Sequence, residues 1–370
     1  MRSSLLASAL VLATLAGCNS SEGDSGSFQT GTGGTPPGTD AATAGASQTG
    51  STDPGSTSGS TAGPDDDSGD AIFDIGNGTG TGTVEACGEP EENPIYVFTR
   101  GLETGAATSI QAFDPQTLTF TPVVASIECD GVGADWGASS MAVDRDRGAW
   151  ITWAAAHDGA GDPAYKRIDR VDLDTGACDV DVAALPTTEN WGSPLGMAYV
   201  SDGPRSGNET LYFVDTGTFL HTIGSASSFG RWWTLGPEGR TFSGVELTGS
   251  GDGRMFSLIM NYTGPFDFEC TARNPCPPTL RLAEVDKSDA TALSMVDLEG
   301  IDAFGIDPGG FAFAYWGGHI WVFISRDFGP TEVFDHDPET QTTTRVVEDG
   351  VLGVVGAGVS TCAPLLLPEG

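Results

Sequence analysis

The sequence predicts an all-β protein, a β-propeller of five four-stranded blades, on three observations. A hairpin with an Asp-led turn, clearest at Arg167–Ala183, recurs along the chain. Short β-branched and aromatic runs alternate with Gly, Asp and Pro turns, and no long stretch has apolar residues at helical spacing. The first repeat lacks one strand, and the C-terminus has one to spare. Six blades are the alternative, if Asn261–Pro278 hides further strands.

Each hairpin copy is a strand that ends in an Asp-led turn and continues into a second strand. The copies are Ile110–Thr117, Ile168–Thr175, Leu282–Asp289 and Thr331–Pro338, aligned on Asp114, Asp172, Asp286 and Asp335, with a degenerate fifth at Phe219–Leu235. Apolar strands precede each copy, at Ile95–Phe98, Trp150–Trp153, Leu211–Val214, Met255–Ile259 and Ile320–Ile324, and four of these follow another strand, at Ser140–Val143, Gly196–Val200, Gly244–Leu247 and Phe311–Tyr315. Four strands over roughly 45 to 65 residues is a length typical of a propeller blade.

The two ends of the folded region are expected to close the ring. The spare strand at Gly358–Pro364 can pair with Ile95–Phe98, which supplies the innermost strand that the first blade lacks. This pairing removes the open edges that an unclosed sheet would expose. Cys87 and Cys362 then lie close enough for a disulfide.

Six cysteines remain when Cys18 is set aside, and an even number in an exported chain predicts three disulfides. Besides Cys87–Cys362, we expect Cys270 and Cys276 to staple the irregular region. By elimination Cys129 pairs with Cys178, yet these two should lie at opposite faces of their blades. Either the loop Ile127–Gly137 folds back, or this pairing is wrong.

The N-terminus has the pattern of a secretory signal peptide, residues 1–17. Arg2 is followed by an apolar segment, Leu5–Leu15, that is too short to span a bilayer. Leu15-Ala-Gly-Cys18 resembles the bacterial lipobox, which implies cleavage before Cys18 and acylation of its sulfur. By the same resemblance, Asn19 after the cysteine implies the outer membrane or cell surface of a Gram-negative bacterium.

Residues 18–86 are rich in Gly, Ser, Thr and Asp and contain few large apolar side chains, which predicts a disordered tether. Residues 87–370 form the predicted propeller domain. The body resembles bacterial β-propeller repeat proteins, and the whole architecture is similar to uncharacterised propeller lipoproteins of myxobacteria and their relatives. The repeats lack the Gly-His and Trp-Asp pairs of WD40 proteins, so the resemblance transfers no site residues.

The net charge of −35 argues against nucleic-acid binding, because an acidic surface repels phosphate backbones. It argues equally against direct docking on anionic lipid, so we expect the lipid anchor to be the sole attachment to the membrane. We expect a monomer. The acidity itself is typical of a protein kept soluble outside the cell.

Ligands of propellers usually bind on one face, here called the loop face, formed by loops that enter each innermost strand and leave each second strand. Two entering loops share a pattern, Asp135-Trp136-Gly and Asn190-Trp191-Gly. The two Trp rings could stack on a sugar or an aromatic ligand, with Asp135 and Asn190 as hydrogen-bond partners. The favoured alternative is that each Trp fills the seam between two blades.

Two arginines, Arg100 and Arg326, follow matching strands in neighbouring blades, and scarce arginines in an acidic protein could bind an anion or carboxylate. An ion pair with one of the many acids is the favoured alternative. Asp-x-Asp at Asp144, Asp172 and Asp335 also occurs in calcium loops, but none continues to a bidentate Glu. We therefore expect no cofactor, with a structural calcium at a blade turn as the alternative.

Signatures of catalysis are sparse in the body: it has no nucleophile elbow, zinc-protease motif or phosphate-binding loop. The sequence favours a non-enzymatic binding or scaffold module for a glycan, peptide or protein partner. The alternative is a glycoside-active enzyme with two carboxylates over the central channel. The carboxylates to examine for that activity are Asp135, Glu189, Asp302 and Asp307.

Overall fold

The structure is a computed structural model of the chain. The residues that it describes all belong to one compact unit, Asp67–Gly370. The described residues are Cys87, 93–100, 108–132, 136–155, 166–183, 196–204, 206–214, 219–222, 229–231, 241–262, 279–303, 306–327 and 329–368. The predicted signal peptide, Cys18 and the tether lie outside this set, as do Cys270 and Cys276. Within it, no helix is long and apolar enough to cross a membrane.

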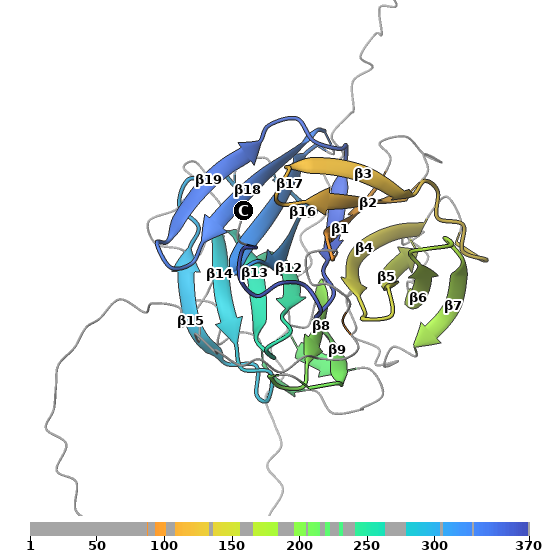
Figure 1. The fold of residues 1–370 in the computed structure, drawn as a ribbon, viewed down its shortest axis with the longest axis horizontal. Helices are drawn as coiled ribbons and strands as arrows, with labels where there is room; N and C mark the ends of the chain where they lie inside the picture. The colour runs from red at the N-terminus through yellow and green to blue at the C-terminus, as the bar shows by residue number, and fades with distance from the viewer. Residues whose placement is uncertain are drawn as a thin grey trace, which may run out of the picture. The chain divides into compact units, whose positions relative to one another are not determined.

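Twenty strands form five antiparallel sheets of four strands each, which confirms the predicted propeller (Figure 1). From the innermost strand outward, the first blade is β20 (Val354–Gly358), β1 (Ile95–Thr99), β2 (Ser109–Asp114) and β3 (Thr119–Val124), and the second is β4 (Trp136–Val143), β5 (Gly148–Ala155), β6 (Lys166–Asp172) and β7 (Cys178–Ala183). The third is β8 (Gly196–Ser201), β9 (Glu209–Val214), β10 (Phe219–Thr222) and β11 (Phe229–Arg231). The fourth is β12 (Thr241–Gly249), β13 (Met255–Tyr262), β14 (Thr279–Val285) and β15 (Ala292–Asp297), and the fifth is β16 (Ile306–Trp316), β17 (His319–Arg326), β18 (Thr331–Asp337) and β19 (Thr342–Val347).

The ring closes by pairing the two ends of the folded region. β20 lies antiparallel to β1, with Tyr96 opposite Gly358 and Val97 opposite Ala357. The innermost strands then contact one another in a complete circuit, β20 to β4, β8, β12, β16 and back to β20. The closing strand ends at Gly358, where the sequence analysis expected it to begin, because the segment after Gly358 turns into the C-terminal tail.

The Cys87–Cys362 disulfide forms as predicted, with 5.1 Å between the two Cα atoms. It joins the segment before β1 to the tail after β20. Both therefore lie on the same side of the propeller, together with the turns that join each innermost strand to the next strand. We call this side the turn face, opposite the loop face.

The Asp-led turns recur as predicted, but the alignment of the last copy on Asp335 was wrong by two residues. Asp337 caps that turn, accepting hydrogen bonds from the Glu339 N–H and the Thr340 hydroxyl, as Asp114 does from Gln116 and Thr117. The residue four places after each capping Asp has a positive φ, at Leu118, Gly176, Ala290 and Gln341. Asp335 instead bonds to His319 on the neighbouring strand. Asx-turn chemistry accounts for the recurrence of these Asp residues.

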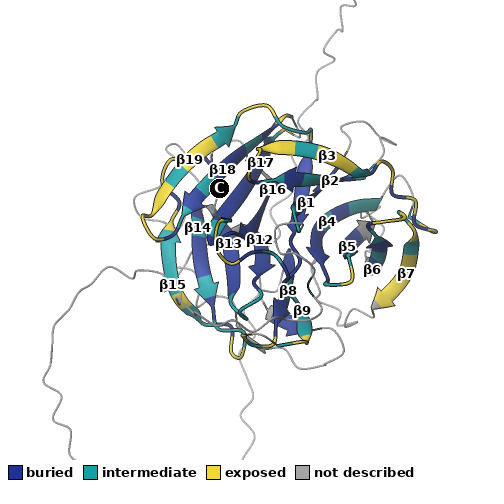
Figure 2. Cartoon of the chain, in the orientation of Figure 1, coloured by how far each residue is buried: buried dark blue, intermediate teal, exposed yellow. Residues whose placement is uncertain are grey.

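The core lies between the blades, because both faces of an inner strand are covered by neighbouring sheets. Figure 2 shows buried residues concentrated toward the centre and exposed ones on the outermost strands β3, β7 and β19. β17 reads as a continuous apolar run, Ile320–Ile324, and all of it is buried. A strand covered on both faces has no need of polar alternation, which explains why these segments were easy to identify from sequence.

The Cys129–Cys178 disulfide also forms, although the two residues were expected at opposite faces. Sheet twist removes the conflict: the end of β3 reaches across to the second blade, so that Val124 lies 3.5 Å from the position of a Cβ on Gly176 in the β6–β7 turn. The chain then runs back past the edge of the first blade, where the Ile127 N–H donates to the Thr108 carbonyl. The predicted pairing of Cys129 with Cys178 is therefore confirmed.

Candidate functional site

Close contact between inner strands narrows the central axis. A Cβ on Gly249 would lie 2.1 Å from the Tyr199 carbonyl oxygen, and one on Gly196 would lie 2.6 Å from the Glu246 Cα. Backbone therefore packs directly on backbone between β8 and β12. The space left among β4, β8, β12 and β20 is about 160 Å³, including the part open to solvent. Along this stretch the axis offers little room for a ligand.

A buried polar network fills the turn face next to the axis. The Arg145 side chain is 7% exposed; its Nε donates to the Thr361 hydroxyl (2.7 Å) and its Nη1 to the Ser206 carbonyl (2.8 Å). The Thr361 hydroxyl donates to Glu209, which also accepts the Arg145 N–H. Burial raises the pKa of Glu209 despite these bonds. The network ties the C-terminal tail to the second and third blades, a structural role.

At the loop face, Trp136 is the first residue of β4 and is half-buried. It packs against the hydrophobic cluster between the first and second blades, which matches the seam position weighed in the sequence analysis. The Arg167 guanidinium carbon lies 5.5 Å from the centre of its ring, a cation–π contact. Trp136 is thus held in a fixed orientation at the rim of the face.

Arg100 lies against the start of β4. Its backbone N–H donates to the Gly353 carbonyl, which fixes the start of the loop that leaves β1. Its side chain is exposed and lies along β4: a Cβ on Gly137 would be 3.3 Å from its Nη1. A glycine after Trp136 therefore leaves the space in which the guanidinium lies. The structure therefore places the Arg100 guanidinium against the residue that follows Trp136.

Arg326 has different surroundings, although its backbone is connected to that of Arg100. The Gly353 N–H bonds to the Gly329 carbonyl and the Gly329 N–H to the Arg326 carbonyl, so both arginines lie on the loop face in neighbouring blades as expected. The Arg326 side chain, however, pairs with Glu332 (3.1 Å) and donates to the Asp302 carbonyl (2.6 Å). The two guanidinium groups thus contact different elements.

The other predicted site residues are not described by the structure. Asp135, Asn190 and Trp191 lie outside the described residues, as does Glu189. Of the carboxylates considered for glycoside chemistry, Asp302 is exposed, and the side chain of Asp307 is outside the described set.

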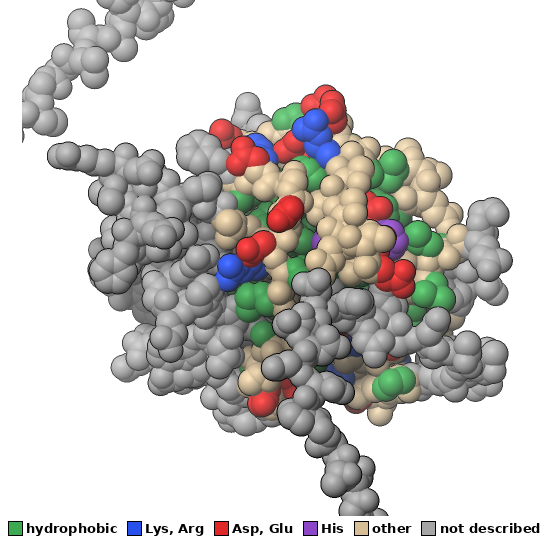
Figure 3. Space-filling model, turned by 90° about the vertical axis from the view of Figure 1, so that its left-hand side faces the viewer, with side chains coloured by type: hydrophobic (Ala, Val, Ile, Leu, Met, Phe, Trp, Pro, Cys, Tyr) green, Lys and Arg blue, Asp and Glu red, His purple; other side chains and the backbone are tan. Residues whose placement is uncertain are grey.

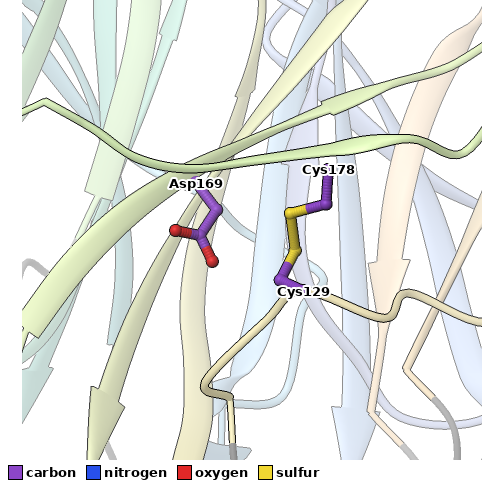
Figure 4. A group of neighbouring side chains, drawn as sticks. All are labelled: Cys129, Asp169 and Cys178. Atoms are coloured by element: carbon purple, nitrogen blue, oxygen red, sulfur yellow. A yellow bond between two sulfur atoms is a disulfide. The ribbon is translucent and has the colours of Figure 1, made fainter.

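Asp169 lies next to the Cys129–Cys178 disulfide (Figure 4). These three side chains have the spacing of a metal site, but the two sulfur atoms are bonded to each other and cannot act as thiolate ligands. The fully buried Asp169 carboxylate accepts two hydrogen bonds from Arg167 and one from the Asp181 N–H. The group is a structural support that orients Arg167 beneath the loop face.

The acidic side chains of the fourth and fifth blades are interspersed with basic ones over the described part of the side shown in Figure 3. Arg345 pairs with Glu332 and Glu348 there, and Arg281 pairs with Asp297. These are exposed or partly exposed pairs, which contribute little to stability.

Glu246 is the residue of most chemical interest that the sequence analysis missed. It lies on β12 between Val245 and Leu247, which pack into the core between the third and fourth blades. Its own side chain is 5% exposed and reaches the Ser140 hydroxyl on β4 (2.9 Å), two blades away around the ring. Burial raises its pKa well above the ordinary value. A single acid inside an apolar inner strand was the signal that could have found it.

Comparison with known proteins finds similarity of fold alone. No family model and no curated protein matches this sequence. Among solved structures, a protein of unknown function from Dyadobacter fermentans is 11% identical, with a TM-score of 0.42 over 69% of this chain and 76% of that one. Periplasmic gluconolactonase PpgL from Pseudomonas aeruginosa is 13% identical, with a TM-score of 0.37 over 72% of this chain and 98% of that one.

TolB from Acinetobacter baumannii is 14% identical, with a TM-score of 0.31 over 70% of this chain. The chain spans about half of TolB, 54% of its length. At such identities and TM-scores these likenesses carry no information about activity.

Proposed function

We propose that this protein is an exported, lipid-anchored propeller that binds a glycan, peptide or protein partner at its loop face, without catalysis. The observation that carries the proposal is the half-buried Trp136 at the start of β4 on that face, with the exposed Arg100 side chain against the next residue, Gly137. An aromatic ring can stack on a sugar or a peptide side chain, and a guanidinium at the same end of the strand can bind an oxygen acceptor.

The contrast between the two faces supports this choice. At the turn face, the described polar groups near the axis bind one another, as Arg145, Glu209 and Thr361 do. At the loop face, Arg167 and Asp169 support Trp136 from behind. The ring is therefore preorganised, which lowers the entropy cost of binding.

Two observations support export and anchoring. The disulfides Cys87–Cys362 and Cys129–Cys178 are bonds that persist in oxidising compartments. Cys87, where the proposed tether joins the propeller, is bonded to the tail on the turn face. A tether that leaves from the turn face keeps the loop face unobstructed.

Binding of polysaccharides and peptidoglycan fragments to the compact unit Asp67–Gly370 tests the proposed site. Trp136→Ala is expected to weaken binding about tenfold, because loss of a stacked aromatic contact removes about 1.4 kcal/mol. Trp136→Phe retains a ring and should bind nearly as well as the wild type. Isothermal titration calorimetry with soluble oligosaccharides gives the dissociation constants.

Arginine variants supply the matched control for this measurement. Arg100→Ala should also weaken binding, whereas Arg345→Ala, which changes an exposed arginine on β19, should not. Binding that is unaffected by both Trp136→Ala and Arg100→Ala would place the partner elsewhere. Release of reducing sugars during the incubation would favour the glycoside-active enzyme instead.

Cys18→Ala is expected to move the protein from the membrane to the soluble fraction, because a stable anchor needs two or more acyl chains and this residue would carry them. Fractionation of cells followed by immunoblotting measures the change, and globomycin should block maturation of the wild type. Membrane association that survives Cys18→Ala, and disappears only when Cys87–Gly370 is deleted, would contradict lipid anchoring.

A further inference from the structure

The five inner strands of the propeller are almost free of charge. Among β4, β8, β12, β16 and β20, the acidic residues are Glu246 and Asp307, and no residue is basic. The chain as a whole contains 51 acidic residues, so an acid is far from rare in this sequence. Acidic residues occupy only two positions in the inner strands, and this makes the buried Glu246 carboxyl unusual.

A chain of hydrogen bonds through this carboxyl joins three blades. The Met197 N–H on β8 donates to the Ser140 hydroxyl oxygen on β4 (3.0 Å), and that hydroxyl donates to Glu246 Oε2 on β12 (2.9 Å). Met197 and Ser140 belong to adjacent blades, and Glu246 reaches past β8 to meet them. The carboxyl therefore ties the second, third and fourth blades together at the axis.

No described cation compensates a negative charge at this position. The Ser140 hydroxyl is the one group that favours ionisation of Glu246, and burial outweighs it, so the pKa of Glu246 lies well above its usual range. An unpaired carboxylate in a low-dielectric interior is strongly disfavoured. In the folded ring the group is held in its neutral form.

The other described titratable groups of the inner strands are tyrosines. β4 and β20 carry no titratable group, and Tyr199 on β8 has its pKa raised by burial and by Asp144 and Glu209. On β16, burial raises the pKa of Tyr315 to about 12, and the Asp307 side chain is not described. Glu246 is thus the one carboxyl among the described side chains of these strands.

We propose that Glu246 is a proton-binding site that keeps the axis of the propeller closed, and that loss of its proton loosens β4, β8 and β12. An ionised Glu246 would have one hydrogen bond and no cation, so water would have to reach it. Because β8 and β12 pack backbone to backbone at Gly196 and Gly249, water reaches the carboxylate when these strands separate. This inference goes beyond the proposed function and is independent of any ligand.

The direction of the effect on stability follows from proton linkage. The folded state binds the Glu246 proton more tightly than the unfolded state, because the folded pKa is the higher one. Its contribution is fully present below the ordinary glutamate pKa of about 4.3 and is lost as pH rises toward the folded pKa. The effect also reaches the loop face, because β4 carries both Ser140 and Trp136.

Thermal unfolding and amide exchange of the intact chain between about pH 5 and pH 9 test this proposal. We expect the wild type to lose stability relative to Glu246→Gln as pH rises. After correction for intrinsic exchange, peptides that cover β4, β8 and β12 should exchange about tenfold faster at the alkaline end in the wild type. Glu246→Gln, which cannot ionise, should show neither change.

Two controls separate this site from general effects of pH. Glu339→Gln removes an exposed carboxylate at a blade turn and should follow the wild type. If Glu246→Gln fails to fold, infrared spectroscopy of the wild type at neutral pH tests the proposal instead, through the carbonyl band of a protonated carboxyl. Identical pH profiles for the wild type and Glu246→Gln, or absence of that band at neutral pH, would overturn the proposal.

Discussion

Replacement of Cys87 and Cys362 by alanine is expected to lower the free energy of unfolding by roughly 5 to 6 kcal/mol in the chain-entropy model. The disulfide closes a loop with a sequence separation of 275, and the cost of losing a crosslink rises with the logarithm of loop length. The loss should appear first where β20 pairs with β1, because the bond holds the tail of β20 on the segment before β1. Urea denaturation of the oxidised protein measures it.

The second disulfide provides the matched comparison. Cys129 and Cys178 have a sequence separation of 49, so removal of both with alanine should destabilise by about 1.5 kcal/mol less in the chain-entropy model. Faster amide exchange in β20 should accompany the first double variant and not the second. A larger loss for Cys129 and Cys178 would show that ring closure depends mainly on strand pairing and packing.

Arg145→Met is expected to destabilise the fold by about 3 to 5 kcal/mol, because it leaves Glu209 buried without its cation. Thr361 would then have no guanidinium partner, and the C-terminal tail would lose its attachment to the second and third blades. Glu209→Gln in the same chain should recover part of the loss, which a double-mutant cycle by urea denaturation would quantify.

The pH dependence of this variant has a definite sign. Burial already raises the pKa of Glu209, and loss of Arg145 raises it further, so acid neutralises the stranded carboxylate. The loss of stability caused by Arg145→Met should therefore become smaller as pH falls below the raised pKa of Glu209. Arg345→Met, on an exposed pair, should cost little stability at any pH. Equal losses for the two variants would contradict a structural role for the Arg145 network.

The fold was predictable because its signals are local. Strands covered on both faces read as apolar runs, as at Ile320–Ile324, and the turns that join them need a capping Asp. Where the pattern left two choices, local reading failed: Asp335 and Asp337 both precede turn residues, and only the observed hydrogen bonds identify Asp337 as the cap. The closing strand shifted for the same reason, because both Val354–Gly358 and the segment after it are strand-like.

The candidate site was predictable only in part. Trp136 and Arg100 were chosen from sequence for separate reasons, and the structure shows the Arg100 guanidinium packed against Gly137, the residue after Trp136. Arg326 was paired with Arg100 by topology, and its side chain instead contacts Glu332. The direction of a side chain at the end of a strand depends on which residues of the adjacent blade lie next to it. That depends on the angle between blades, which the sequence does not reveal.

The sequence by itself determined the repeat and the closure of the ring, because strand alternation, turn chemistry and the missing first strand are properties of short segments. It left the number of blades at five or six, and the structure decided for five. Only the tertiary structure decided which distant groups meet. The twist of the sheets brought Cys129 to Cys178, and the narrow ring brought Glu246 on β12 to Ser140 on β4. Both contacts depend on the rotation accumulated from blade to blade, a long-range quantity that no single segment encodes.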